Sequence, residues 1–337
     1  MDSRAAVRAV VPARAALAGN PSDGFGGAVV AVPVPVFAAT VEVALDVGST
    51  AGSTIGAVNP TAGETSSDAS GLRHLVDVTV EYLVQRQAMP AELAERATIA
   101  VHTTIPRSVG LAGSSAIVLG VIDALRAADT DARWTTDLTD PTVRSFAALE
   151  VETQGLGIAA GLQDRLVQSH GRPALMDFGA DAPRVPGSDG ALRARTTPLP
   201  APPGQWLLAH RTTASAPSGV VHGPLAQRAD RIAAEMAALG SAALDAARAI
   251  ERGSIAELGE AMDRTFALRA ELLDLAPPHV EMVQAARAVG AHANYTGSGG
   301  AVIVLCRDSR VLRAATAALS VLEDCVVTDD PFGAHAG

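Results

Sequence analysis

The chain has 337 residues, of which 48% are hydrophobic and 18% charged, so it can bury a sizeable core and form two ordinary domains or one large one. Its net charge of −10 makes nucleic acid and anionic membrane surfaces poor partners, because both attract basic proteins. All 26 basic side chains are arginines, and the absence of lysine excludes a P-loop lysine and a Schiff-base lysine. No apolar run reaches about 18 residues, so we expect no membrane span and a cytoplasmic protein.

Alternating apolar residues predict strands, and a 3.6-residue apolar period predicts helices, along the first half of the chain. In order, the pattern predicts strands at 6–19 and 27–45, a helix at 70–86, a strand at 97–105, a helix ending near 128, a helix at 141–154, and a helix and a strand between 155 and 178. Pro33 and Pro35 favour an edge strand or a bulge in the second strand, because proline cannot donate to a sheet ladder.

The stretch 180–204 is the densest in Pro and Gly, and we expect a domain boundary near Pro200. The boundary predicts an N-terminal domain over 1–200 and a C-terminal domain over 201–337. In the second domain the pattern predicts a strand at 205–211, several helices between 221 and 289, a strand–turn–strand at 292–307, a helix at 310–322 and a last strand at 324–327.

Three loops of small residues stand out, because small side chains let a ligand approach the backbone. The first is GNPSDGFGG (19–27), the second is RSVGLAGSS (107–115), and the third is TGSGGA (296–301). The second loop precedes the most apolar helix of the chain, and a helix N-terminus offers unpaired N–H groups that suit phosphate. Each loop alone is also compatible with an ordinary turn or helix cap. None has the G-x-G-x-x-G order of a dinucleotide-binding turn.

Two carboxylates, Glu152 and Asp164, stand twelve residues apart across the loop TQGLGIAAGLQ (153–163). Such a pair can point into one cleft, with one carboxylate holding Mg²⁺ and the other facing a hydroxyl. The plain alternative is that both lie on solvated helix faces. Arg14 lies in an otherwise apolar strand, where a cation needs a partner unless it reaches the strand end. His222 begins a helix and either faces a substrate or is structural.

The segment PRSVGLAGSSA (106–116) resembles the ATP-phosphate loop of the GHMP kinases, the superfamily of galactokinase, homoserine kinase, mevalonate kinase and phosphomevalonate kinase. The first and third loops fall where that family has its first and third motifs. Within the superfamily the chain looks most like the glucuronokinase branch, and the resemblance covers nearly the whole chain. It is carried by segments such as GNPSDGFGG, GLGIAAGLQDRLVQSHGRPALMDF and VEMVQAARAVGAHANYTGSGGAVIVLC. It implies a two-domain α+β fold: an N-terminal domain like ribosomal protein S5 domain 2, a ferredoxin-like C-terminal domain, and ATP between them.

The resemblance also implies a role for each matching residue. Asp164 matches the catalytic aspartate of the family, and Arg14 matches the basic residue that faces it. Ser115, alone or together with Ser114, matches the loop serine near Mg²⁺ and the phosphates. Glu152 matches the Mg²⁺ glutamate, and Glu150 is the alternative to it. The ATP-binding residues implied by the second and third motifs are Pro106, Gly110, Leu111, Ala112, Gly113, Ser114, Ser115, Ala116, Gly297, Ser298, Gly299 and Gly300.

The expected acceptor is a small molecule: a sugar, a sugar acid or a cyclitol, bound by a monomer or a homodimer. The candidate substrate-binding residues are Asn20, Ser22, Asp23, Gly26, Arg107 and His222. A sugar-acid carboxylate needs a basic partner, for which Arg107 and Arg73 are candidates. Val220 stands where we expect a basic residue in plant-type relatives, which keeps a neutral sugar or another polyol open.

The branch implies phosphorylation of the anomeric hydroxyl when the acceptor is a sugar. Two further alternatives remain from the resemblance. One is a mevalonate-pathway kinase or decarboxylase, whose substrates are also acidic. The other is a sensor of sugar or ATP on the same fold that has lost catalysis. The retained Asp164, Glu152 and Arg14 favour an enzyme.

Overall fold

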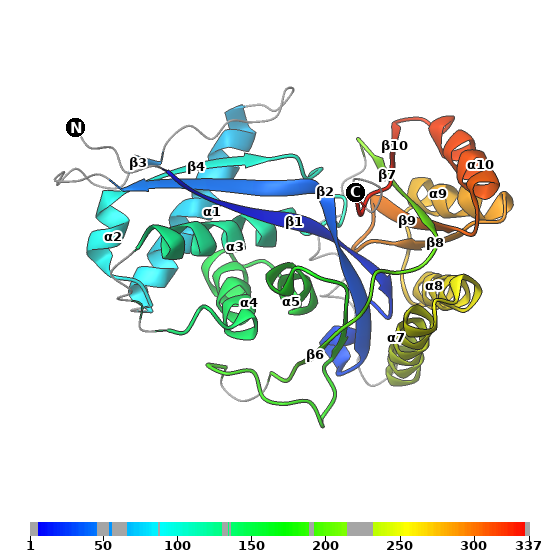
Figure 1. The fold of residues 1–337 in the computed structure, drawn as a ribbon, viewed down its shortest axis with the longest axis horizontal. Coiled ribbons are helices and arrows are strands. Elements are labelled where there is room, and N and C mark those ends of the chain that lie inside the picture. The colour runs from blue at the N-terminus through cyan, green and yellow to red at the C-terminus, as the bar shows by residue number, and fades with distance from the viewer. Residues whose placement is uncertain are drawn as a thin grey trace.

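The computed structural model describes residues 6–45, 54–55, 66–86, 88–129, 134, 136–188, 192–213 and 232–333. Within these residues the chain forms two sheets, each packed against helices, that lie next to one another (Figure 1). The strands of the first sheet precede residue 200 and those of the second follow it. The division into domains 1–200 and 201–337 stays our proposal.

The first sheet is built on two long antiparallel strands, β1 (Val7–Ala18) and β2 (Ala28–Leu45). The C-terminal half of β2 also pairs with β4 (Ala97–Thr103), and its N-terminal end pairs with β5 (Ala174–Asp177). Two short strands lie outside these, β3 (Thr54–Ile55) beside β4 and β6 (Arg195–Pro198) beside β5. β2 is therefore the central strand of the sheet.

The two prolines of β2 occupy the only stretch of the strand where neither β4 nor β5 needs its N–H groups. Pro33 and Pro35 lie between Ala31, the last residue paired with β5, and Ala39, the first paired with β4. The β1 register shifts here as well, since Pro12 pairs with Ala38 while the next residue of β1 pairs with Val34. The bulge expectation is confirmed, and the edge-strand expectation is wrong.

Helices cover one face of the first sheet (Figure 1). They are α1 (Ser66–Gln85), α2 (Ala91–Arg96), α3 (Gly113–Ala128), α4 (Pro141–Glu150) and α5 (Gln163–His170). α3 is buried on nearly every side, because it packs on β1 and β2 and is itself covered by other helices. A short 3₁₀ turn, Ser22–Phe25, joins β1 to β2. The sequence pattern predicted neither this turn nor α2.

The second sheet has the strand order β10-β7-β9-β8. Its strands are β7 (Gln205–Arg211), β8 (His292–Tyr295), β9 (Ala301–Cys306) and β10 (Cys325–Asp329). Its helices are α7 (Ala233–Arg252), α8 (Ile255–Leu272) and α9 (Pro277–Ala288) between β7 and β8, and α10 (Ser309–Ser320) between β9 and β10. The connectivity of this sheet is ferredoxin-like, as the resemblance implies, because β7 is followed by a helical segment, two strands, a helix and a last strand.

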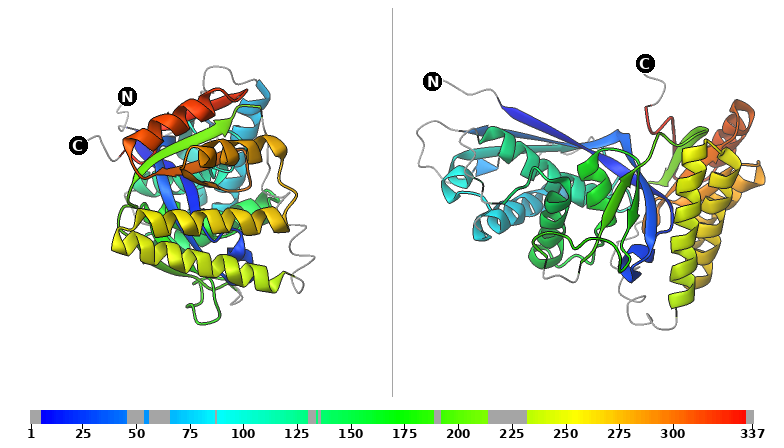
Figure 2. Two further views of the ribbon diagram at one scale, coloured as in Figure 1. Left: turned by 90° about the vertical axis from the view of Figure 1, so that its right-hand side faces the viewer. Right: turned by 60° about the horizontal axis from the view of Figure 1, so that its bottom comes forward.

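Side chains alternate across the second sheet and join it to the rest of the molecule. Trp206 and Leu208 share a core with α7, α8 and the first sheet, while Leu207 and Ala209 share one with α9 and α10. Figure 2 shows α7 and α8 beside the ends of β1 and β2. No helix within the described ranges is both long enough and apolar enough to cross a membrane.

Hydrogen bonds tie the end of β1 directly to the second half of the chain. The Ala16 N–H donates to the Thr296 carbonyl at 2.9 Å, and the Asn294 side-chain amide donates to the Leu17 carbonyl at 3.0 Å. The Gly19 N–H donates to the Thr265 hydroxyl of α8 at 3.2 Å. The first and third glycine-rich loops follow directly on these contacts, so the fold brings them together.

Candidate active site

A cavity of about 570 Å³ opens where the three loops meet. Its volume is in the range of small-molecule sites. The second loop and the start of α3 supply one wall, the segment leading into α5 supplies another, and Asn20, Arg269 and Gly297 close the end beside the second sheet. Residues that are far apart in the sequence therefore share one cavity.

The second loop presents the N-terminus of α3 to this cavity. Ser108, Gly110 and Ala112 all have positive φ, at 54°, 76° and 59°, which turns the backbone sharply before the helix starts. No side chain caps α3, so the N–H groups of its first turn have no capping partner. Uncapped N–H groups and the positive end of the helix dipole form a site for an anion.

The third loop packs so closely on the second that both need glycine. A Cβ at Gly110 would come within 2.9 Å of the Ser298 nitrogen, and a Cβ at Gly297 within 2.4 Å of the Gly110 carbonyl oxygen. The Thr296 hydroxyl also donates to that carbonyl at 3.0 Å. The TGSGGA loop thus supports the phosphate-loop candidate from behind, and Gly297 and Ser298 reach the cavity.

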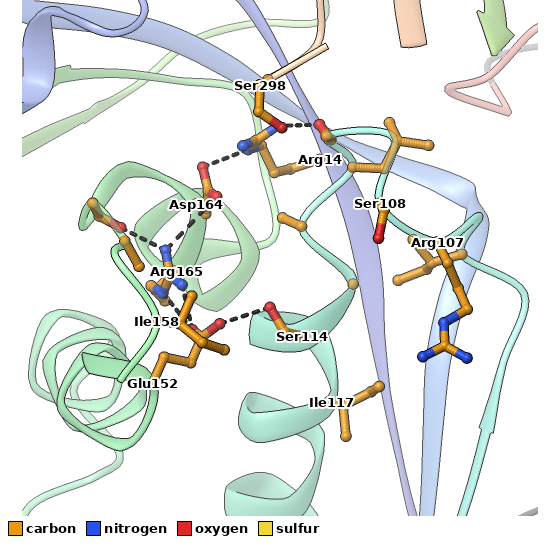
Figure 3. A pocket seen from close by; sticks show the side chains of 18 of the residues that line it. Arg14, Arg107, Ser108, Ser114, Ile117, Glu152, Ile158, Asp164, Arg165 and Ser298 are labelled. Carbon is orange, nitrogen blue, oxygen red and sulfur yellow. Dashed lines mark hydrogen bonds and ion pairs between the residues drawn. The ribbon is translucent and has the colours of Figure 1, made fainter. Parts of the chain in front are cut away.

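Arg14 joins all of these parts (Figure 3). The residue is 4% exposed, and its Nε donates to Oδ1 of Asp164 at 2.5 Å. Its Nη1 donates to the carbonyls of Gly110 at 2.8 Å and Thr296 at 2.6 Å. One guanidinium therefore fixes the carboxylate of α5 against both loops, which explains a buried arginine in an apolar strand.

A second ion pair lies deeper in the same wall. Glu152 sits in a π-helical turn, Val151–Gly155, that continues α4, and it is fully buried. Its Oε2 accepts from Nε of Arg165 at 2.7 Å and also from Nη2, while its Oε1 accepts from the Ser114 hydroxyl at 2.7 Å. Burial alone would lower the pKa of the Arg165 guanidinium, but the carboxylates of Glu152 and Asp164 outweigh it and raise that pKa.

The Ser114 hydroxyl and Oε1 of Glu152 are the oxygens that could reach a divalent cation beside the α3 N-terminus. No cluster of three or more His, Cys, Asp or Glu side chains suited to a metal occurs in the described part of the chain. Mg²⁺ in nucleotide sites commonly takes one or two protein oxygens and completes its shell with phosphate and water. These two oxygens therefore fit Mg²⁺ that arrives with a nucleotide and replaces the hydrogen bond between them.

The structure brings most of the sequence-predicted residues to the cavity wall. Those that line it are Arg14, Asn20, Pro106, Arg107, Gly110, Leu111, Ala112, Gly113, Ser114, Glu152, Asp164, Gly297 and Ser298. Those that lie outside the wall are Ser22, Asp23, Gly26, Ser115, Ala116, Gly299 and Gly300. His222 and Val220 lie outside the described residues.

The metal-ligand expectation for Ser115 needs a correction. Ser115 is fully buried, and its hydroxyl donates to Oε1 of Gln168 at 2.6 Å. Gln168 in turn donates to the carbonyls of Pro12 and Ala112, which locks the side chain inside the fold. The serine that faces the cavity and Glu152 is its neighbour Ser114. The alternative metal ligand Glu150 binds Tyr82 and Arg86 instead.

The first loop contributes less to the wall than expected. Of its predicted substrate residues only Asn20 lines the cavity. The Ser22 hydroxyl donates to the Ala28 carbonyl at 2.9 Å, Asp23 accepts from Gln163 at 3.3 Å, and Gly26 ends the 3₁₀ turn with φ 74°. These three residues shape the loop, and Asn20 is the one that it presents.

The sequence did not single out six polar residues of the wall, which are His74, Thr103, Ser108, Gln163, Arg165 and Arg269. Gln163 and Arg165 flank Asp164, and nothing in the sequence separates them from solvated helix residues. Arg269 did carry a signal. It continues the stripe of Leu258, Met262 and Thr265 on α8, a position where an apolar residue is expected.

Solved structures share this fold. The L. major mevalonate kinase in complex with R-mevalonate gives a TM-score of 0.73 at 15% identity and covers 97% of this chain and 95% of that chain. The Lactococcus lactis galactokinase complexed with galactose gives a TM-score of 0.69 at 14% identity, over 97% of this chain and 94% of that chain. The two-domain α+β architecture is therefore that of this class of small-molecule kinases.

Comparison of the sequence with family models and with known proteins identifies the family of this chain. Residues 74–172 match the family model described as GHMP kinases N terminal domain, and residues 246–323 match the one described as GHMP kinases C terminal. The two matches together take in more than half of the chain, which belongs to the GHMP kinase family. Glucuronokinase 1 of Arabidopsis thaliana is 34% identical over 219 residues, which are 62% of this chain and 57% of that protein. The match thus spans little more than half of the relative's length.

Proposed function

We propose that this chain is an ATP- and Mg²⁺-dependent kinase that phosphorylates a hydroxyl, the anomeric one in our expectation, of a sugar or sugar acid. The observation that carries the proposal is the Arg14–Asp164 pair: a carboxylate held at 2.5 Å by a buried arginine, in the cavity that also contains the uncapped start of α3. A base and an anion site in one cavity are the two parts that phosphoryl transfer to an alcohol requires.

The phosphates of ATP would lie against the backbone of Gly110–Ser114 and the first turn of α3. The small side chains leave those N–H groups open, and the packing of Gly297 on Gly110 keeps the loop from moving away. Ser114 and Glu152 would hold Mg²⁺, which supplies charge neutralisation for the phosphate oxygens when bound. Apolar residues of the wall, Leu72, Leu75 and Ile117, suit the nucleoside.

Asp164 would accept or orient the proton of the acceptor hydroxyl. Its side chain is 18% exposed, so it can meet a substrate, whereas Arg14 behind it is 5% exposed and stays in place. Arg14 fixes the direction of the carboxylate and offsets the negative charge around the transferred group. A well-placed base contributes on the order of 10²–10⁴-fold to the rate, and positioning and charge stabilisation supply the larger share.

The acceptor class rests on the relative that is 34% identical, whose name is Glucuronokinase 1. A hexuronic acid is therefore our leading acceptor, and a neutral sugar or a valienol-type cyclitol is the second candidate. The polar end of the cavity, with Asn20, Gln163 and Arg269, suits a polyhydroxylated ligand better than an apolar one.

The test is release of ADP from Mg·ATP in the presence of glucuronate, galacturonate, neutral hexoses, a valienol-type cyclitol or mevalonate. Acceptor-dependent release with a sugar or sugar acid supports the proposal. Release only with mevalonate would reassign the chain to mevalonate-type chemistry. ATP binding without release for any acceptor would indicate a sensor on the same fold and overturn the proposal.

A further inference from the structure

The end of the cavity beside the second sheet contains a buried positive charge that the phosphoryl-transfer machinery leaves unexplained. Arg269 comes from α8, is 1% exposed and lines the cavity. Its Nη2 donates to the Gly297 carbonyl at 2.7 Å and its Nη1 to the Asn20 carbonyl at 3.3 Å. Both partners are neutral, and among the described residues no carboxylate forms an ion pair with this guanidinium.

Of the three other arginines of the wall, two are buried and paired with carboxylates, and the third, Arg107, is exposed. Arg14 binds Asp164, and Arg165 binds Glu152. The charge of Asp23 acts on Arg269, and Oδ1 of Asp23 accepts a hydrogen bond from Gln163. Burial lowers the pKa of Arg269 to about 10, so the side chain still carries its charge at neutral pH. The guanidinium also lies over the Tyr295 ring, 5.4 Å from its centroid. These partners are neutral, and a buried charge that no opposite charge offsets is costly, so an anionic ligand would be favoured here.

Polar atoms around Arg269 are also without partners. Nε of Arg269, Oδ1 of Asn20 and Oε1 of Gln163 are all buried, and none makes a hydrogen bond to a described residue. All three residues line the same cavity. Buried polar atoms in native proteins are nearly always satisfied. One cationic donor and two neutral acceptors match a molecule with one carboxylate and several hydroxyl groups.

The arginines that the sequence suggested for a carboxylate are placed less well. Arg73 and Arg107 are both exposed, and an exposed charge is screened by water. Figure 3 shows Arg107 on the opposite side of the α3 start from Asp164, with its guanidinium directed away from that carboxylate. Arg269 by contrast lies next to the reacting end, because its partner Gly297 also packs on Gly110 and near the Arg14 guanidinium.

We propose that Arg269 is the specificity residue of the acceptor subsite and binds the carboxylate of a hexuronic acid, while Asn20 and Gln163 accept hydrogen bonds from its hydroxyl groups. The inference rests on the proposed kinase function for the identity of the acceptor, but it makes a separate claim about charge recognition. It assigns acid selectivity to α8 and leaves ATP binding to the second and third glycine-rich loops.

The test compares the binding of glucuronate with that of glucuronamide, which replaces the carboxylate by a neutral amide of nearly the same shape. Isothermal titration calorimetry with the full chain and Mg·ADP gives both dissociation constants without turnover. A hydrogen-bonded buried charge is worth about 10- to 100-fold in affinity, so the wild type should prefer the acid by that factor. Arg269→Gln should remove the preference and leave the affinity for Mg·ADP unchanged.

Arg264→Gln is the matched control, because Arg264 lies on the same helix but is half-exposed and pairs with Asp245 on the surface. It should retain the full preference for the acid. Arg269→Lys retains the positive charge but loses the planar guanidinium that can bind both carboxylate oxygens. Most of the preference for glucuronate over glucuronamide should therefore be lost. If neither Arg269 variant folds, the wild-type comparison can still overturn the inference, because a buried arginine that binds the carboxylate requires the acid to bind better than the amide.

Equal affinity of the wild type for acid and amide, or no binding of either, would overturn the inference. So would a loss of Mg·ADP affinity in Arg269→Gln as large as the loss for the acid, because Arg269 would then serve the phosphates. These outcomes differ from failure of the kinase proposal. Turnover of a neutral sugar without acid preference removes only the role of Arg269, whereas acid preference without any ADP release removes only the kinase activity.

Discussion

Two arginine–carboxylate pairs lie within one cavity wall, and they differ in how far they are open to it. In the Arg14–Asp164 pair the carboxylate side chain is 18% exposed, and Arg14 holds its Oδ1 at hydrogen-bond distance. In the Arg165–Glu152 pair the carboxylate is fully buried, and both oxygens accept hydrogen bonds from the protein. The chemistry of the two pairs is the same, but only the first has a carboxylate with room for a substrate.

The difference indicates separate tasks for the two pairs: the open Asp164 can meet a substrate, while the buried Arg165–Glu152 pair stabilises the wall behind it. Asp164 and Arg165 are adjacent on the first turn of α5, and the helix turns them to different partners. Nη1 of Arg165 still lies 3.7 Å from Oδ2 of Asp164, so the buried pair braces the open one. The predictions below change one pair at a time.

The largest effect is expected for Asp164→Asn, which keeps the shape of the side chain but removes its capacity to take a proton. The turnover rate should fall by about 10²–10⁴-fold, while the KM for ATP and the thermal stability change little. Steady-state kinetics with the acceptor identified by ADP release, together with a thermal melt, measure both quantities.

Asp177→Asn is the control for this substitution. Asp177 is a surface carboxylate of β5 that pairs with the half-exposed Arg195, far from any proposed role in catalysis. Its variant should keep the full rate. An Asp164→Asn enzyme as active as the wild type would remove Asp164 from the chemistry, whatever the control does.

The second largest effect concerns stability and the buried pair. Arg165→Met leaves the buried Glu152 carboxylate without its cation, and breaking a buried ion pair in this way costs about 3–5 kcal/mol. Urea unfolding should show that loss of unfolding free energy. Arg195→Met breaks an exposed pair for comparison and should cost less than about 1 kcal/mol. Equal losses for the two variants would mean that Glu152 is far less enclosed than the structure indicates.

Much of the site could be predicted because its markers are local. Glycines and serines before an apolar helix, an arginine in an apolar strand and a carboxylate beside a glycine loop each break the surrounding pattern. Arg14 and Asp164 were both predicted on those grounds and through the family resemblance, and the structure places them in contact. Their catalytic roles stay predictions.

The remainder depends on packing that no local pattern encodes. Pro33 and Pro35 suggested an edge because their own N–H groups are missing, but the length of β2 lets two neighbours share the strand on either side of them. Arg269 lies on a helix whose relation to the first loop is set by the docking of the two sheets. Long-range pairing decides both cases, and a single sequence does not show it.

The choice between Ser114 and Ser115 failed for a related reason, and it leads to the smallest expected effect. α3 is apolar on nearly every side, so no amphipathic stripe indicates which of two adjacent serines faces outward. Ser114→Ala should remove one hydrogen bond to a charged group at the proposed Mg²⁺ site and lower kcat/KM by about 10-fold or somewhat more. This loss of kcat/KM should become smaller as the Mg²⁺ concentration is raised.

Ser115→Ala should leave kcat/KM near the wild-type value and cost about 1–3 kcal/mol of unfolding free energy, because Oε1 of Gln168 loses its buried donor. Initial rates over a series of Mg²⁺ concentrations and urea unfolding midpoints separate the two variants. If Ser115→Ala instead lost kcat/KM and Ser114→Ala lost stability, Ser115 would be the metal ligand, and the side-chain directions described for the start of α3 would be wrong.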